Sequence, residues 1–175
     1  MNRVIYFLVA SVLGACSALE GEQKTNVNDI IKTHEIRQFT DVEVVMASEK
    51  YGANLYLQID TLMSQGVLDC STILKGESEY LDSLNQKIGG QISLGLAATD
   101  FRTKQEKELF EAYEYNYENE MDSKPSIQRM DDQYVLYTVA VESKDPSYET
   151  CLPEDTPIAM WSMIIPVKTV IISLD

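Results

Sequence analysis

Apolar residues recur at helical spacing through the middle of the chain and form denser runs in its last third. Intervals of three and four predict one helix over residues 53–65 and a longer one over residues 71–88. Gly66 suits the end of the first helix, and the pair Gly89 and Gly90 ends the second. The apolar positions of the two helices are Leu55, Ile59, Leu62, Met63, Ile73, Leu74, Tyr80, Leu81, Leu84 and Ile88.

Residues 40–52 allow two interpretations. Thr40 and Glu43 have the spacing of a capping box, which is typical of a helix start. Apolar residues alternate over 42–47, which favours a strand instead, and Gly52 interrupts a helical pattern. The pattern leaves both interpretations open.

A third helix is predicted over residues 101–121, with Thr99 or Asp100 as its cap. Residues 92–98 before it form a short apolar run that suits a strand or a helix equally. One face of the third helix carries Leu109, Phe110, Tyr113, Tyr117 and Met121, and the other carries Glu106, Glu111, Glu114 and Glu118.

Three tyrosines alternate along this predicted helix. Tyr113 and Tyr117 share a face, and we expect both in the core, whereas Tyr115 points about 200° away among acidic residues. Tyrosine is enriched at protein interfaces, so an exposed tyrosine among carboxylates is a plausible docking surface. Trp161 has two interpretations, a core anchor on a strand or part of a partner surface. The candidate partner-binding residues are Tyr115, Glu111, Glu114, Glu118 and Trp161.

The last third of the chain predicts strands. Residues 134–141 are β-branched and aromatic on both faces, which indicates a central strand. Residues 158–165 and 167–174 form two further predicted strands around Pro166, which marks an edge, bend or bulge. Helices first and strands last predict an α+β fold, with N-terminal helices packed on a small C-terminal antiparallel sheet.

The N-terminus has the pattern of a secretory signal over residues 1–15. Arg3 precedes an apolar run over residues 4–13, which is about half of the roughly 20 residues that a membrane-spanning helix needs. The sequence Leu-Gly-Ala-Cys at 13–16 resembles the lipobox of bacterial lipoproteins. The alternative is a plain secretory signal with a chance cysteine near its cleavage site.

The resemblance implies that the signal is removed and that Cys16 carries the acyl chains of a membrane anchor. It places the protein in a bacterial cell envelope, and Ser17 after the cysteine favours the outer membrane over the inner. Residues 16–29 carry almost no apolar pattern and are interpreted as a flexible tether. Residues 30–175 have the length and composition of a single globular domain.

The chain is strongly acidic. It has 28 acidic and 14 basic residues and a formal net charge of −14 at pH 7. Nucleic acid does not fit as a partner, because phosphate recognition needs clustered lysine and arginine. Acidic charge keeps a secreted protein soluble, and it can also steer the domain toward a basic protein.

Two cysteines are left if Cys16 is acylated. An even pair outside the cytoplasm predicts a disulfide between Cys70 and Cys151, with two buried free thiols as the alternative. The bond would close a loop of about 80 residues and stabilise the fold by roughly 4 kcal/mol. A zinc site is not indicated, because the sequence has no Cys-x-x-Cys pair and His34 is its only histidine.

No motif indicates an enzyme or a bound cofactor. The sequence lacks a Gly-x-Ser-x-Gly nucleophile motif, a glycine-rich phosphate loop, a dinucleotide fingerprint and a calcium loop. We expect His34 at the surface. The pair Asp131 and Asp132 is the most site-like of many carboxylates, although we prefer to interpret it as a charged turn before a strand.

These features favour a non-enzymatic, membrane-anchored envelope lipoprotein that binds or supports another envelope protein. One alternative is a periplasmic inhibitor or immunity-type protein that neutralises a basic enzyme through an acidic face. A second alternative is a carboxylate-dependent hydrolase, which would need two converging carboxylates in a cleft.

Overall fold

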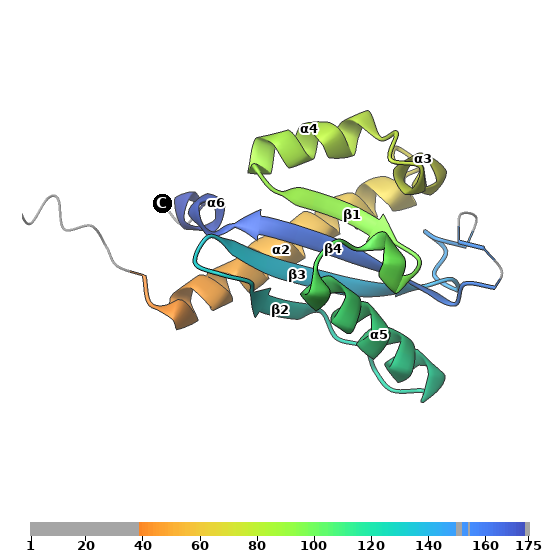
Figure 1. Cartoon of the computed structure of the whole chain (residues 1–175). Helices are drawn as coiled ribbons and strands as arrows, with labels where there is room; N and C mark the ends of the chain where they lie inside the picture. The colour runs from red at the N-terminus through yellow and green to blue at the C-terminus, as the bar shows by residue number, and fades with distance from the viewer. Residues whose placement is uncertain (1–38, 150–151, 154, 174–175) are drawn as a thin grey trace, which may run out of the picture. The chain divides into compact units, whose positions relative to one another are not determined.

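The computed structural model describes residues 39–149, 152–153 and 155–173, whose helices pack on a four-stranded antiparallel sheet (Figure 1). The predicted fold class, α+β with N-terminal helices on a small C-terminal antiparallel sheet, is confirmed. The predicted signal peptide, Cys16 and the tether lie outside the described residues. None of the helices within the described ranges is long and apolar enough to cross a membrane.

Helix α2 runs without a break over Asp41–Ser64, so the strand alternative for residues 42–47 is wrong. It begins with the predicted capping box, in which Thr40 and Glu43 each accept a hydrogen bond from the other's backbone N–H. Gly66, with φ of +66°, follows its C-terminal cap. The buried positions of α2 follow helical spacing but include a serine and a glycine: Val44, Ser48, Gly52, Leu55, Ile59 and Met63.

The second predicted helix is divided into two. Helix α3 covers Cys70–Leu74, and helix α4 covers Glu79–Ile88. Gly76 lies between them with φ of +71°, a conformation that cannot continue a right-handed helix. The Ser78 hydroxyl accepts a hydrogen bond from the backbone three residues later and so begins α4. Gly89 ends α4 in the left-handed conformation, as predicted.

The ambiguous run after α4 is a strand. Strand β1 covers Gln91–Gly95, and a single 3-10 turn, η1, covers Ala98–Asp100. Helix α5 then extends over Lys104–Glu118. Its cap is a second capping box, Thr103 with Glu106, which lies later in the chain than the residues that the sequence pattern favoured.

Three further strands complete the sheet in the order β1-β4-β3-β2. They are β2 (Ser126–Arg129), β3 (Tyr134–Glu142) and β4 (Ile158–Pro166). Strand β3 lies between two neighbours, as its apolar sequence predicts. Strand β2 has only four residues, most of them polar, so the pattern along the chain does not indicate it.

The strand predicted over residues 167–174 is wrong, because Val167–Ile172 forms helix α6. Pro166 has no N–H to continue the ladder, and the chain turns there into the helix. The Thr169 hydroxyl donates a hydrogen bond of 2.8 Å to the carbonyl of Ile88, which ties α6 to the end of α4. Tertiary contacts therefore override a β-branched sequence.

The sheet has a core on each face. Helices α2 and α6 cover one face, and α5 lies on the other (Figure 1). The residues that β1, β3 and β4 contribute to the larger core are Ile92, Leu94, Val135, Tyr137, Val139, Val141, Ala159, Trp161, Met163 and Ile165. The smaller core under α5 consists of Phe101, Phe110, Tyr113, Ile158 and Met160.

Candidate functional site

Four of the five predicted partner-binding residues lie together on the outer surface of α5. The side chain of Tyr115 is 59% exposed, and Glu111, Glu114 and Glu118 are exposed as well. Residues three and four apart are neighbours on a helix surface, so Tyr115 lies beside Glu111 and Glu118. The helix therefore presents a tyrosine flanked by carboxylates.

The prediction that Tyr117 belongs to the core is wrong, because its side chain is 40% exposed. Tyr113, one turn earlier on the same face, is only 4% exposed. The difference arises because the C-terminal end of α5 extends beyond the edge of the sheet (Figure 1). Tyr117 thus joins the accessible surface, although helical spacing places it with the core residues.

Tyr113 fixes α5 where the helix leaves the sheet. Its hydroxyl lies 3.0 Å from the hydroxyl of Thr138 on β3, and it also lies within hydrogen-bond distance of the Lys124 carbonyl, at 3.1 Å. Burial raises the pKa of Tyr113, so the phenol stays protonated. These contacts hold the helix against both the sheet and the segment that returns to β2.

A groove of about 880 Å³ lies beside this end of α5. Glu120, with φ of +54°, turns the chain out of the helix and along the groove. The apolar lining residues are Tyr117, Met121, Ala140 and Ile158. The charged lining residues are Glu118, Glu120, Asp122, Glu142, Lys124 and Lys144.

The groove has an excess of negative charge. Its four carboxylates exceed its two lysines, and Lys144 forms an ion pair of 2.5 Å with Glu142. That hydrogen bond and charge raise the pKa of Lys144. We call the groove together with Tyr115, Glu111 and Glu114 the α5 surface; it combines exposed aromatic side chains with uncompensated carboxylates.

Trp161 is fully buried, as its core interpretation predicts, and it offers no accessible surface to a partner. Its indole N–H donates a hydrogen bond of 2.8 Å to the hydroxyl of Tyr148, whose pKa burial raises to about 12. Cys70, the first residue of α3, is disulfide-bonded. Because Cys151 lies outside the described residues, the pairing of these two cysteines stays a prediction.

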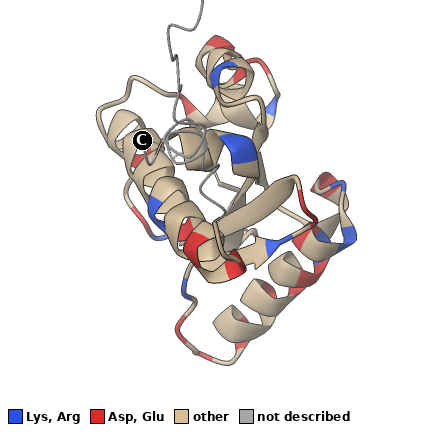
Figure 2. Ribbon diagram, turned by 90° about the vertical axis from the view of Figure 1, so that its left-hand side faces the viewer, with Lys and Arg blue, Asp and Glu red and all other residues tan. Residues whose placement is uncertain are grey.

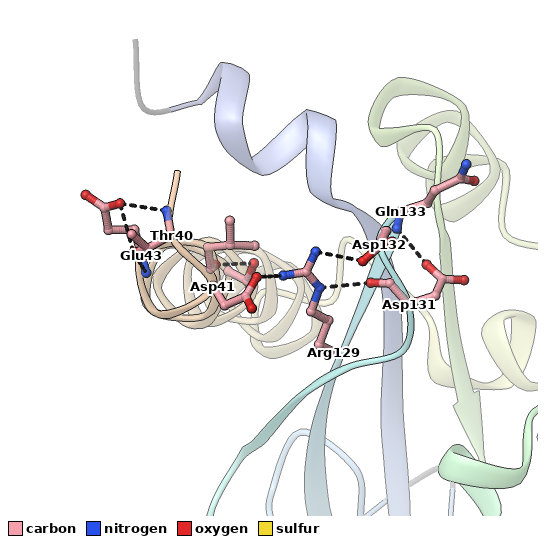
Figure 3. Close-up of polar contacts among 9 residues, drawn as sticks. Thr40, Asp41, Glu43, Arg129, Asp131, Asp132 and Gln133 are labelled. Atoms are coloured by element: carbon pink, nitrogen blue, oxygen red, sulfur yellow. Dashed lines mark hydrogen bonds and ion pairs between the residues drawn. The ribbon is translucent and has the colours of Figure 1, made fainter. Parts of the chain in front are cut away.

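Asp131 and Asp132 hold a turn together (Figure 3). Asp131 Oδ1 accepts hydrogen bonds from the backbone N–H groups of Gln133 at 2.7 Å and of the residue after it at 2.8 Å. Asp132 pairs with Arg129 at 3.3 Å, and Arg129 also pairs with Asp41 at the start of α2. Both carboxylates are thus engaged in local structure, which agrees with the charged-turn interpretation.

A second pair of carboxyl groups interacts electrostatically, Asp60 on α2 and Asp145 in the loop after β3. Both Asp60 and Asp145 are half-buried, and burial together with the charge of Asp145 raises the pKa of Asp60. Asp145 also accepts a hydrogen bond of 2.9 Å from the backbone N–H of Ser147 within its own turn. A raised carboxyl pKa, as at Asp60, is one of the features that the hydrolase alternative requires.

Glu106 is the charged residue that the sequence pattern misplaced. Helical spacing predicts it on the polar face of the helix, yet it is 1% exposed, and its side chain lies between α5 and the sheet. Its two oxygens accept hydrogen bonds from the Ser162 hydroxyl at 2.6 Å and from the Thr103 backbone and hydroxyl at 2.9 and 2.8 Å. The capping-box spacing of Thr103 and Glu106 is the signal that could have found it.

The described residues contain no group of three or more His, Cys, Asp or Glu side chains arranged to hold a metal ion. His34 lies outside the described residues. No protein-family model, curated protein or solved structure matches this chain.

Proposed function

We propose that this protein is a lipid-anchored bacterial envelope protein that binds a basic segment of another envelope protein, without catalysing a reaction. The α5 surface is the observation that carries the proposal. It exposes Tyr115, Tyr117 and Met121 beside uncompensated carboxylates, at and just after the C-terminal end of α5.

The chemistry of the surface fits a lysine- or arginine-rich partner. Tyrosine rings attract cations above their faces, and they provide contact area at a small cost in conformational entropy. Carboxylates such as Glu114 and Glu118 accept charge-assisted hydrogen bonds from arginine and lysine. The net charge of −14 also steers a basic partner toward the domain before contact.

The proposed anchor supports the same role. Acyl chains on Cys16 would confine the domain to a membrane surface, more plausibly that of the outer membrane, and a flexible tether of the predicted length reaches on the order of 20 Å. Confinement raises the effective concentration of a binder for partners in the same envelope.

An inhibitor or immunity-type protein that neutralises a basic enzyme is the second candidate, and the acidic net charge favours it. Acidic side chains, however, are distributed over several helices and loops, with basic ones between them (Figure 2). This distribution favours a local contact at the α5 surface over a single broad acidic face.

The test is capture from envelope extracts with the immobilised full chain and its variants. We expect Tyr115→Ala with Tyr117→Ala to lower the captured amount of one basic protein at least tenfold. Truncating a single hot-spot tyrosine at an interface costs about 2 kcal/mol or more, and about 1.4 kcal/mol already corresponds to tenfold. Tyr80→Ala is the matched control, because Tyr80 is 41% exposed on α4, outside the α5 surface.

Charge is tested with Glu114→Lys and Glu118→Lys, with Glu77→Lys and Glu79→Lys as a control of equal charge change. We expect capture to fall as salt rises and to be lost in the first double variant only. Capture of the same proteins by the α5 variants and their controls, at every salt concentration, would refute the proposal.

A further inference from the structure

A second groove, of about 330 Å³, lies between α2, α4 and the end of α6, and its charge is opposite to that of the chain. Two lysines, Lys50 and Lys87, line it. The described lining residues include no aspartate or glutamate, although acidic residues outnumber basic ones two to one in the sequence. The groove is therefore a local basic site on an acidic protein.

Neither lysine is neutralised by a described residue. The ion pairs of the described residues do not include Lys50 or Lys87. Their neighbours on the helix surface, three and four positions away, are all uncharged. Lys87 lies in the last turn of α4, where a cation interacts favourably with the helix dipole. Lys50 lies in the middle of α2 and makes no such interaction.

The floor of the groove is apolar. Leu55 and Ile88 are buried beneath it, and Ala47 and Leu84 are partly buried at its sides. Tyr51 stands at the rim with a pKa that burial raises, so its hydroxyl remains a neutral hydrogen-bond donor. The groove thus combines an aliphatic floor with two ammonium groups and a phenol at its rim.

We propose that this groove binds a small anionic amphiphile, a monocarboxylate with a short aliphatic chain. The carboxylate would lie between the ammonium groups of Lys50 and Lys87, and the aliphatic chain would cover Leu55, Leu84 and Ile88. The volume is at the lower end of the range for small-molecule sites, which suits a ligand smaller than a typical drug. The site is separate from the α5 surface and does not depend on it.

The test is a titration of the isotope-labelled full chain with octanoate, followed by two-dimensional amide NMR. We expect saturable shifts at the backbone amides around Lys50 and at Leu84 to Ile88. Octanol, which lacks the charge, should bind at least several-fold more weakly, and octylammonium should cause no shift there. Inorganic phosphate should bind more weakly than octanoate, because it has no group for the apolar floor.

Charge reversal gives the decisive comparison. Lys50→Glu with Lys87→Glu should weaken octanoate binding at least tenfold, whereas the charge-matched control Lys75→Glu with Lys107→Glu should leave it within about twofold. If the reversed variant fails to fold, Lys50→Gln with Lys87→Gln takes its place, with a smaller loss expected.

Any of four results would overturn the proposal. The first three are the absence of saturable shifts at these amides, equal binding of octanoate and octanol in the wild type and in the Lys50/Lys87 variants, and an equal loss of octanoate binding in the Lys75/Lys107 control. Equal binding of inorganic phosphate and octanoate would also overturn it, because the site would then be selective for charge alone.

Discussion

Replacing Gly52 with alanine tests the closest approach between α2 and the sheet. A β-carbon at this position would lie 2.4 Å from Cγ, 2.7 Å from Cδ2 and 2.9 Å from Cβ of Tyr137. Tyr137 is 3% exposed, and its Cβ is attached to the backbone of β3, which is paired on both sides. The ring therefore cannot turn away without disturbing the core.

Two opposing effects set the size of the change. Alanine favours a helix interior over glycine by about 1 kcal/mol. Relief of the contacts requires α2 to move by about 1 Å or Tyr137 to leave its rotamer, and such overpacking costs about 1–3 kcal/mol and occasionally more. Because three atoms of Tyr137 are affected and one of them, Cβ, is bonded directly to the strand backbone, we expect a net loss of about 1–2 kcal/mol in the free energy of unfolding.

Urea denaturation followed by the fluorescence of Trp161 measures this change, with Ala53→Gly at an exposed neighbouring position as the propensity control. That control should lose about 1 kcal/mol. In a Tyr137→Ala background, the penalty of Gly52→Ala should fall, because two of the three contacting atoms are gone. A stabilisation of about 1 kcal/mol by Gly52→Ala in the wild-type background would refute the reasoning.

Three further predictions concern the buried Glu106, the half-buried Asp60 and the anchor. Glu106→Ala should lower the free energy of unfolding by about 3 kcal/mol in urea denaturation, because the hydroxyl of Ser162 and the backbone N–H of Thr103 lose their acceptor. The double variant Glu106→Leu with Ser162→Ala should recover most of the lost stability. The pKa of Asp60 is higher in the folded state than its value near 4 in the unfolded state. Ionisation of Asp60 therefore lowers the free energy of unfolding as pH rises through these two pKa values. Asp60→Asn should accordingly be more stable than wild type at pH 7 and equal to it at pH 3. Cys16→Ser should move the native protein from the membrane fraction to the soluble fraction, with loss of acyl mass in intact-mass spectrometry.

Each of these has a contradicting outcome. A loss below 1 kcal/mol for Glu106→Ala would mean that the buried hydrogen bonds contribute little. An Asp60→Asn variant with the same pH profile as wild type would remove Asp60 from the pH dependence. A native protein that is soluble and carries no acyl mass would exclude the lipid anchor and, with it, the argument for a membrane-confined partner.

The hydrophobic pattern predicts elements well where buried residues are apolar and poorly where they are not. The alternation over residues 42–47 includes Val42 and Met46, but both side chains are about two-thirds exposed and contribute nothing to packing. The buried face of the same helix uses Ser48 and Gly52, which an apolar count ignores. Two of the three residues behind the strand signal at 42–47 thus lie on the surface, and only Val44 is buried.

Position in the fold explains the other errors. Whether a helix face is buried depends on whether the sheet lies beneath it. Helical spacing predicts Tyr117 on the apolar face and Glu106 on the polar face, but Tyr117 is exposed and Glu106 is buried. The outward direction of Glu111, Glu114 and Tyr115 follows from spacing alone and was predictable. The basic groove was not, because Lys50 and Lys87 come from helices whose packing no local pattern reveals.

The sheet order has a consequence for how this domain can associate. Its two nine-residue strands, β3 and β4, lie in the middle, and its edges are β1 and β2, with five and four residues. Edge strands this short present few backbone groups to a foreign strand. We therefore expect association through side chains on helices, with little strand addition or edge-to-edge aggregation, even at high protein concentration.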